Sequence, residues 1–249
     1  MIELTIFIIG VCIGSFVNVL GMRLAKGKNI FNDRSVCDHC HKKLLAIDLI
    51  PVLSYFMLGG KCRFCHRKIS IQYPIVELTT AFAFLGIYTA GFPHTVFLMV
   101  VFSLFLAIVI ADWKYLIIPN SLVFALISIS LLFNIVYSPQ LLMNRLLTSI
   151  GAFAFLWIIY TLTRGKGMGF GDVKFSLVMG LLLGYPQIII AFYIAFLTGA
   201  GVGIILLLLH KAKFGQHIPF GPFLVLATIV TFIWEKQLLI IFLKILGLH

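Results

Sequence analysis

Long apolar stretches recur along nearly the whole chain, separated by short breaks of glycine, proline and polar residues. Crossing about 30 Å of hydrocarbon takes roughly 20 helical residues, and most of these stretches approach that length. The pattern therefore predicts an all-α polytopic membrane protein with about eight transmembrane helices. The predicted spans are residues 2–22, 73–90, 95–111, 121–137, 146–162, 173–183, 188–209 and 219–234.

Two apolar segments do not fit a simple span. Segment 173–183 is too short to cross the bilayer alone, so it must extend into its flanks or form a broken helix buried among its neighbours. The tail, residues 237–249, is apolar with a single lysine. Its pattern is compatible with an interfacial helix and with a further span.

One stretch of soluble character interrupts the apolar pattern. Residues 23–72 carry ten of the basic residues and three of the acidic ones. We therefore divide the chain into a first transmembrane helix at 1–22, an insert at 23–72 and a multi-helix membrane domain at 73–249.

Composition and charge support this division and orient it. With 61% apolar and 11% charged residues, the chain has too few charges to cover a soluble surface. The net charge of +11 would suit nucleic acid, but sixteen of the nineteen basic residues fall on one side of the predicted spans. Basic loops stay in the cytoplasm, so we expect the amino terminus outside and the insert inside. The expected partner is the lipid bilayer and not a nucleic acid.

The insert contains two cysteine pairs, Cys37-x2-Cys40 and Cys62-x2-Cys65, separated by 21 residues. This spacing is typical of zinc ribbons, in which two tight turns each present two thiolates to one tetrahedral ion. Disulfides would be reduced on a cytoplasmic loop. We therefore predict a small zinc-ribbon-like insert holding a structural Zn2+, because four thiolates leave no open position for a catalytic water.

Three histidines lie within or beside these pairs, and any of them can replace a thiolate in a zinc site. We expect them instead to be solvated loop residues. They are His39, His41 and His66.

Two of the eight acidic residues lie where charge is costly. Asp112 ends the third predicted span, and Asp172 ends the glycine-rich connection before the sixth. The chain between them crosses outward once and back once, so both carboxylates face the cytoplasmic side at similar depth. An acid near hydrocarbon is a functional candidate, and two that approach each other would share one proton. One carboxylate can then deprotonate a water while the other protonates the attacked carbonyl, as in aspartic proteases.

The connection before Asp172 has glycine at every second position from 165 to 171, which lets its backbone pass close to a peptide. We therefore name Gly169, Gly171 and Lys174 as active-site loop candidates. The spacing of a phosphate-binding loop is absent.

Other roles for the two aspartates stay open on the residues alone. They can be interfacial anchors paired with Lys114 and Lys174. They can also relay protons in a small ion-coupled transporter, although we see no second copy of the insert or of the glycine-rich loop. A third possibility is a non-catalytic, zinc-bearing membrane scaffold.

Several separated motifs, in order, resemble those of the type IV prepilin leader peptidases, membrane aspartic proteases of the GxGD class. The similarity covers most of the chain. The motifs comprise residues 14–19, the two cysteine pairs, 51–55, 60–65, 73–77, Asp112 with 118–120, 167–174 and 219–223.

The resemblance implies that Asp112 and Asp172 are the catalytic pair. It implies a bacterial cytoplasmic membrane protein that resembles the competence-type members of the family. The implied substrate is the amino-terminal leader of a prepilin or pseudopilin, cut on the cytoplasmic side before its hydrophobic segment. Many members also methylate the new amino terminus with S-adenosylmethionine. Residues 22–27 depart from the family in lacking a proline, and this departure bears on the methyltransferase activity.

The positive inner face of this chain should repel a basic leader. We therefore expect the hydrophobic segment of the substrate, by entering the bilayer, to supply most of the binding. Glu77 or Asp48 then either receives the basic residues of the leader or pairs with those of the insert.

Overall fold

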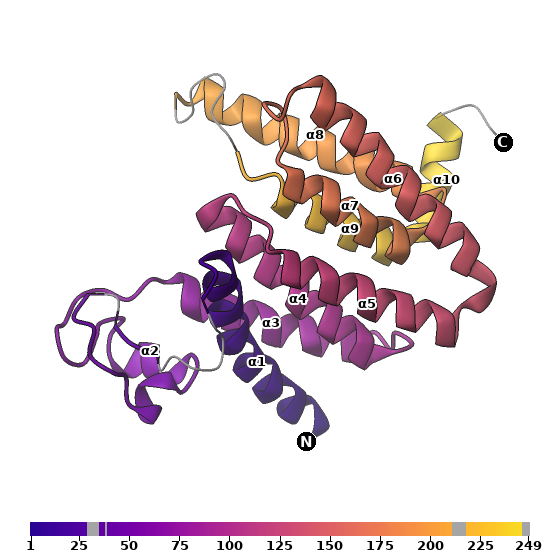
Figure 1. The fold of residues 1–249 in the computed structure, drawn as a ribbon. Helices are drawn as coiled ribbons and strands as arrows, with labels where there is room; N and C mark the ends of the chain where they lie inside the picture. Colours follow the sequence, from indigo (N-terminus) through magenta and orange to yellow (C-terminus); the bar gives the residue numbers. More distant parts are fainter. Residues whose placement is uncertain (29–34, 38, 211–217, 246–249) are drawn as a thin grey trace. The chain divides into compact units, whose positions relative to one another are not determined.

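The computed structural model describes residues 1–28, 35–37, 39–210 and 218–245, and the chain forms two compact units, Met1–Ile110 and Ala111–His249. Within the described ranges it is helical, with two short 3-10 helices at Ala46–Leu49 and Pro139–Leu141. The α-helices are α1 (Ile2–Ala25), α2 (Leu53–Met57), α3 (Gln72–Thr89), α4 (Thr95–Tyr115), α5 (Asn120–Tyr137), α6 (Leu142–Leu162), α7 (Phe170–Leu183), α8 (Gln187–Leu208), α9 (Gly221–Ile233) and α10 (Glu235–Ile245) (Figure 1).

Each of the eight predicted spans is a helix, which confirms the fold class. By length and composition, however, five helices in the described ranges are able to cross a membrane, or six if the bent pair α9 and α10 forms one span. The five are α1, α4, α5, α6 and α8. The count of eight is therefore larger than these criteria support. The polar residues Gln72 and Glu77 lower the hydropathy of α3, and α7 has only 14 residues.

Helix α7 is short because it lies inside the second unit. It contacts α5, α6, α8 and α9 (Figure 1). Ten of its residues are buried, among them Phe175, Val178 and Met179 with no exposed surface. Segment 173–183 thus meets both expectations: it extends into its amino-terminal flank, and it is buried among its neighbours.

In the first unit, α1 packs closely on α3 through two glycines four residues apart. A Cβ atom on Gly10 would lie 2.6 Å from the Cα of Ala81, and one on Gly14 would lie 2.6 Å from the Cα of Glu77. This spacing of small residues lets the backbones of membrane helices approach each other. Helices in lipid gain no hydrophobic free energy by associating, so close van der Waals packing between their backbones has to stabilise the pair.

In the second unit, α6 and α7 make a similar close approach. A Cβ on Gly180 of α7 would lie 2.3 Å from the Cα of Ser149 on α6. The hydroxyl of Ser149 donates to the carbonyl of Leu177 at 2.8 Å. The carboxyl end of α7 is held by the buried Asn134 of α5, which donates to the carbonyl of Leu181 at 2.9 Å and accepts from Arg145.

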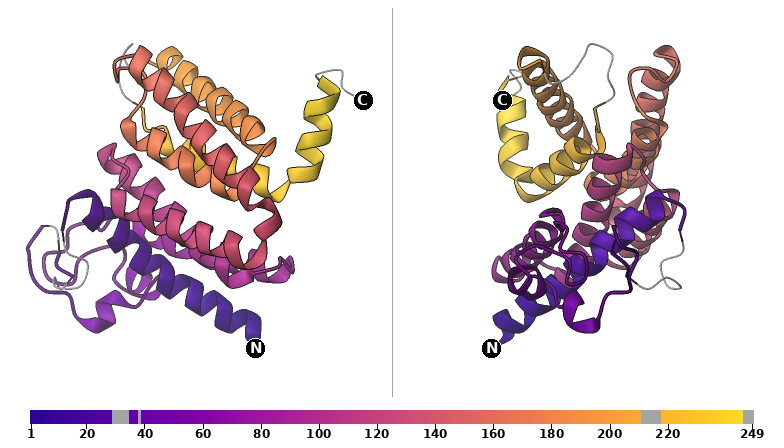
Figure 2. Two further views of the ribbon diagram at one scale, coloured as in Figure 1. Left: turned by 45° about the vertical axis from the view of Figure 1, so that its right-hand side comes forward. Right: turned by 90° about the vertical axis from the view of Figure 1, so that its left-hand side faces the viewer.

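The described part of the tail is helix α10, which turns by 95° from α9 (Figure 2). The Nε2 atom of Gln187, at the start of α8, donates to Glu235 Oε1 at 2.6 Å. This bond ties the start of α10 to the start of α8. The turn is compatible with both roles expected for the tail, an interfacial helix and a broken span.

The contact between α6 and α7 predicts the effect of a single methyl group. Gly180→Ala should destabilise the protein by about 1–3 kcal/mol, because the backbone at Ser149 has to move. Gly151→Ala on α6 is the matched control, because a Cβ there meets no atom within 4 Å. Thermal unfolding in detergent should show a lower midpoint for Gly180→Ala alone. Equal midpoints for the two variants would contradict the close contact.

Candidate functional site

Asp112 lies in the last turn of α4 and is 5% exposed. The helix ends three residues later, and Leu116 then takes the left-handed conformation with φ of 54°. The carboxylate oxygen Oδ2 of Asp112 accepts a hydrogen bond of 2.8 Å from the backbone N–H of Gly221. Gly221 is the first residue of α9, so the start of that helix holds the carboxylate.

Asp172 is the third residue of α7 and is also 5% exposed. Its Oδ2 atom accepts a hydrogen bond of 3.2 Å from the N–H of Gly169, and its own N–H donates to the carbonyl of Gly169 at 3.1 Å. The carboxylate thus makes the N3 half of a capping box, and the second bond is a backbone turn bond because Gly169 has no side chain. Asp172 is therefore fixed by the first turn of its own helix.

The turn between α4 and α5 contacts the start of α7. A Cβ on Gly171 would lie 3.0 Å from the Cβ of Ile118. Lys174 donates a hydrogen bond to Asn120 Oδ1, and its ammonium nitrogen lies 5.3 Å from the centre of the Phe170 ring. Within the described residues, Lys174 thus interacts with Asn120 and Phe170, and not with Asp172 as in the anchor interpretation. These contacts hold the end of α4, which carries Asp112, near the start of α7, which carries Asp172.

The two carboxylates form one electrostatic site. They are sixty residues apart in sequence, yet the charge of Asp112 acts on the carboxyl group of Asp172. Each lies at a helix amino terminus, Asp112 at that of α9 and Asp172 at that of α7, where exposed N–H groups and the helix dipole stabilise negative charge. Repulsion between the two carboxylates opposes the ionisation of both and favours a state in which the pair holds one proton. Such a pair can act as a general base and a general acid together.

Gly221 is a site residue that the sequence reasoning missed. It lies 109 residues from Asp112, and a Cβ on it would be 2.8 Å from Asp112 Oδ2. Only glycine leaves the carboxylate room at this distance. The motif at 219–223 was visible in the resemblance, but no spacing linked it to Asp112.

The four cysteines of the insert form a second site, in the first unit. Their sulfur atoms all lie within 4.8 Å of one another, and the Sγ atoms of Cys37 and Cys65 are 3.8 Å apart. Tetrahedral bonds of about 2.3 Å to one zinc ion place sulfur atoms roughly 3.8 Å apart, so the cluster fits such an ion. Hydrogen bonds from the backbone N–H groups of Cys65 and Phe64 lower the pKa of the Cys62 thiol to about 7. Against a backbone hydrogen bond from Arg67, burial and the neighbouring thiols raise the pKa of Cys65 to about 11, so Cys62 is the thiol that ionises first.

The two halves of the cluster have the same backbone pattern. His41 donates its N–H to the carbonyl of Cys37 at 2.9 Å, and His66 donates its N–H to the carbonyl of Cys62 at 3.0 Å. Both histidines have φ of 54° and are exposed. They serve as turn residues, and within the described residues the metal-binding group consists of the four cysteines.

Glu77 lies on α3 with its carboxylate buried. Its Oε2 atom accepts a hydrogen bond of 2.7 Å from the N–H of Val52, and the hydroxyl of Ser15 on α1 also bonds to it. Val52 has φ of 61°, an unfavourable conformation for a β-branched residue. Asp48, the other acid considered for the leader, forms a salt bridge of 2.7 Å with Arg63 of the insert.

Comparisons with known proteins cover most of the chain. Residues 8–90 match the family described as the Bacterial Peptidase A24 N-terminal domain, and residues 99–204 match the Type IV leader peptidase family. No solved structure matches the chain.

Several curated relatives carry the name prepilin leader peptidase/N-methyltransferase. One, from Bacillus subtilis, is 30% identical over 96% of this chain and 97% of its own length. Another, from Aeromonas hydrophila, is 30% identical over 94% of this chain and 91% of its own length. A third, from Pseudomonas aeruginosa, is 30% identical over 96% of this chain and 93% of its own length.

These matches confirm the resemblance that the separated motifs indicated, from the first helix to the end of the membrane domain. The chain therefore belongs to the type IV leader peptidase family.

Proposed function

We propose that this protein is a membrane aspartic endopeptidase that removes the amino-terminal leader of a prepilin or pseudopilin. The observation that carries the proposal is the pair of buried carboxylates, Asp112 and Asp172, each held by a backbone N–H at a helix start, with the charge of Asp112 acting on Asp172. The names of the relatives supply the substrate class.

The reaction that suits this pair is direct hydrolysis by water. The ionised carboxylate takes a proton from a water molecule, and the oxygen of that water bonds to the scissile carbonyl carbon. At the same time the protonated carboxyl group donates its proton to the carbonyl oxygen. Collapse of the tetrahedral intermediate breaks the C–N bond, and the leaving amine takes a proton from the pair. No covalent enzyme intermediate is needed. Gly171 lets the loop that carries Asp172 pack against Ile118, while Lys174 holds the loop to Asn120.

Several apolar helices make the chain a multi-pass membrane protein. We propose the cytoplasmic membrane of a bacterium as its location, with the amino terminus outside and the insert inside. With all eight predicted helices taken as crossings, sixteen of the nineteen basic residues then face the cytoplasm. This orientation places both aspartates on the side where the leader is made.

We propose Zn2+ as the ion of the cysteine cluster. Four sulfur ligands close the coordination sphere, so the ion would order residues 23–72 and take no part in hydrolysis. Glu77 supports the same structural role, since its carboxylate ties Val52 of the insert to α3. Its role toward the basic leader stays a proposal, which a charge reversal at Glu77 would test by its effect on leader cleavage.

Methyl transfer is the second activity that the names of the relatives carry. S-adenosylmethionine is charged, and the cavity between α6 and α8 has no charged lining residue, so that cavity does not fit the methyl donor. Binding of labelled S-adenosylmethionine to the purified protein tests this activity separately from cleavage.

Replacing either aspartate should abolish cleavage without unfolding the protein. Asp112→Asn and Asp172→Asn keep the shape of the side chain but remove the shared proton, and should lower kcat by about 100- to 10,000-fold. Glu235→Gln, an identical chemical change at a hydrogen-bonded site on α10, should leave cleavage unchanged. Purified protein and a prepilin, assayed for the shortened product, give the measurement. Full activity in either aspartate variant would exclude the proposed pair, and would favour the transporter or scaffold alternative.

A methyl group at Gly221 should disturb Asp112 directly. Gly221→Ala places a Cβ 2.8 Å from Asp112 Oδ2, so the carboxylate has to shift, and we expect kcat to fall about 10- to 100-fold. Gly201→Ala is the control, because a Cβ there meets no atom within 4 Å. Similar kcat values for both variants would show that the hydrogen bond from Gly221 does not position the carboxylate.

Cysteine replacement tests the metal. Purified protein should contain about one zinc ion per chain, and Cys37→Ser or Cys62→Ser should lower the zinc content and destabilise the insert. Cys12→Ser, at an exposed cysteine of α1 outside the cluster, should change neither. Metal analysis of the three variants decides the question, and parent protein isolated without zinc would contradict the assignment.

A further inference from the structure

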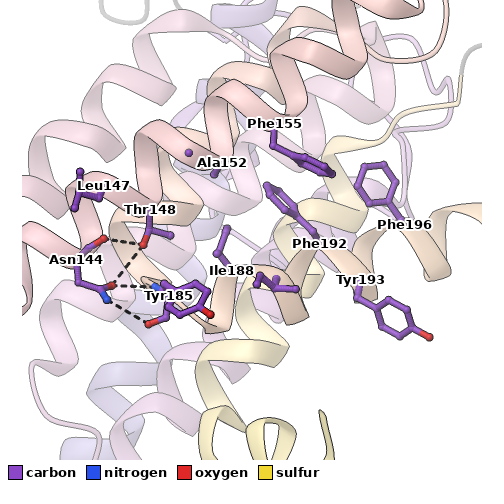
Figure 3. A pocket seen from close by; sticks show the side chains of 12 residues that line it. Asn144, Leu147, Thr148, Ala152, Phe155, Tyr185, Ile188, Phe192, Tyr193 and Phe196 are labelled. Atoms are coloured by element: carbon purple, nitrogen blue, oxygen red, sulfur yellow. Dashed lines mark hydrogen bonds between the residues drawn. The ribbon is translucent and has the colours of Figure 1, made fainter. Parts of the chain in front are cut away.

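An apolar cavity of about 720 Å³ lies between α6 and α8 in the second unit (Figure 3). Helix α6 lines it with Leu147, Gly151 and Phe155, and α8 lines it with Phe192 and Tyr193. Figure 3 shows three phenylalanines at one end and the polar groups of Asn144, Thr148 and Tyr185 at the other. None of the lining residues is charged.

The cavity opens sideways from the helices. Leu147 is 63% exposed and Tyr193 is 61% exposed, and both belong to helices that are long and apolar enough to cross the membrane. In a bilayer this opening faces hydrocarbon, so an occupant must be apolar along its length and must leave no backbone group unpaired. An acyl chain and an apolar helix both meet that requirement.

A row of aromatic rings leads from the cavity toward the carboxylate pair. Ring centres are 5.5 Å apart for Phe155 and Phe192, 6.4 Å for Phe192 and Phe196, and 5.3 Å for Phe196 and Phe220. Phe220 directly precedes Gly221, whose N–H holds Asp112. The cavity is thus connected through packed side chains to the residue that positions one carboxylate.

The approach of Phe220 to α8 depends on a small residue. A Cβ on Gly199 would lie 3.0 Å from the ring of Phe220. Along α6, the cavity extends from Asn144 to Phe155, a rise of about 16 Å or three helical turns. The cavity is therefore long enough to contact about three turns of a bound helix, and the aromatic row continues from its end to the site.

We propose that this groove binds the hydrophobic segment of the substrate as a helix. The proposal rests on the proposed function, because a prepilin carries such a segment directly after the cleavage site. With the segment between α6 and α8, the row from Phe196 to Phe220 leads its amino-terminal end to Asp112. A phospholipid tail fits the apolar walls less well, because no lysine or arginine lines the groove to pair with a phosphate group.

The first experiment fills the groove. A Cβ on Gly151 or on Gly201 meets no atom within 4 Å, so both positions have space for a large side chain, but only Gly151 lines the groove. With a full-length prepilin, Gly151→Phe should raise KM about tenfold or more and leave kcat unchanged, because binding is lost equally in the ground and transition states. Gly201→Phe should match the parent in both constants. An unchanged KM for Gly151→Phe would overturn the proposal.

The second experiment locates the segment directly and does not depend on turnover. A photoreactive phenylalanine derivative replaces Tyr193, which lines the groove, or Tyr137, which is similarly exposed at 59% and lies outside it. In an Asp172→Asn background, irradiation with prepilin in lipid vesicles should give an adduct with the hydrophobic segment from position 193 and not from 137. Adducts with lipid alone, or equal adducts from both positions, would overturn the proposal.

Failure of the proposed function has a different signature. If parent protein does not cut prepilin at all, the peptidase assignment fails, whatever the adducts show. If the parent cuts prepilin while Gly151→Phe behaves as the parent and position 193 captures only lipid, the peptidase assignment stands and the groove is a lipid site.

Discussion

The second unit depends on keeping two carboxylates stable at a place where charge is costly. Neither Asp112 nor Asp172 has more than 5% of its surface exposed, and each is held by a backbone N–H at the start of a helix. Backbone donors cannot move away as side chains can, so they fix both the position and the charge of the pair. The contact of Gly171 with Ile118 serves the same purpose, since it joins the segments that carry the two acids. The order of packing follows from this constraint: α7 must be central, and α9 must begin beside the end of α4.

Much of this architecture was predictable because its signals are local in sequence. The helices follow from runs of apolar residues, the cysteine cluster from two short spacings, and the two aspartates from the cost of an acid near hydrocarbon. The features that could not be predicted are contacts between helices. These helices are apolar on all sides, so no amphipathic pattern indicates which face packs against which neighbour. The bond from Gly221 to Asp112 joins residues 109 apart, and the ring contact of Phe196 with Phe220 joins α8 to the start of α9. Hydropathy also does not give an exact number of spans, because buried and membrane-crossing helices have the same composition.

The first unit is built on different physics. Its helices α1 and α3 approach through Gly10 and Gly14, and the insert between them is too small for a core of its own. Order in the insert therefore rests on polar contacts and on the proposed metal, with four sulfur atoms at one end and the bond from Val52 to the buried Glu77 at the other. The unfavourable backbone of Val52 persists because this bond and the following helix α2 fix it. Loss of either attachment would leave a module that is tethered to the membrane but has no defined shape.

The length of α7 determines how deep Asp172 lies relative to the ends of the surrounding helices. Helix α8 has 22 residues, about 33 Å, and begins just after α7 ends, so the carboxyl end of α7 lies at a membrane surface. With 14 residues, α7 is about 21 Å long, and its start falls roughly 9 Å short of the opposite edge of the hydrocarbon. Protein and not lipid surrounds this shorter helix, because α5, α6, α8 and α9 all pack against α7. The proposed hydrolysis would therefore take place below the ends of the longer helices around α7, and a peptide bond would have to descend between them before water could attack it.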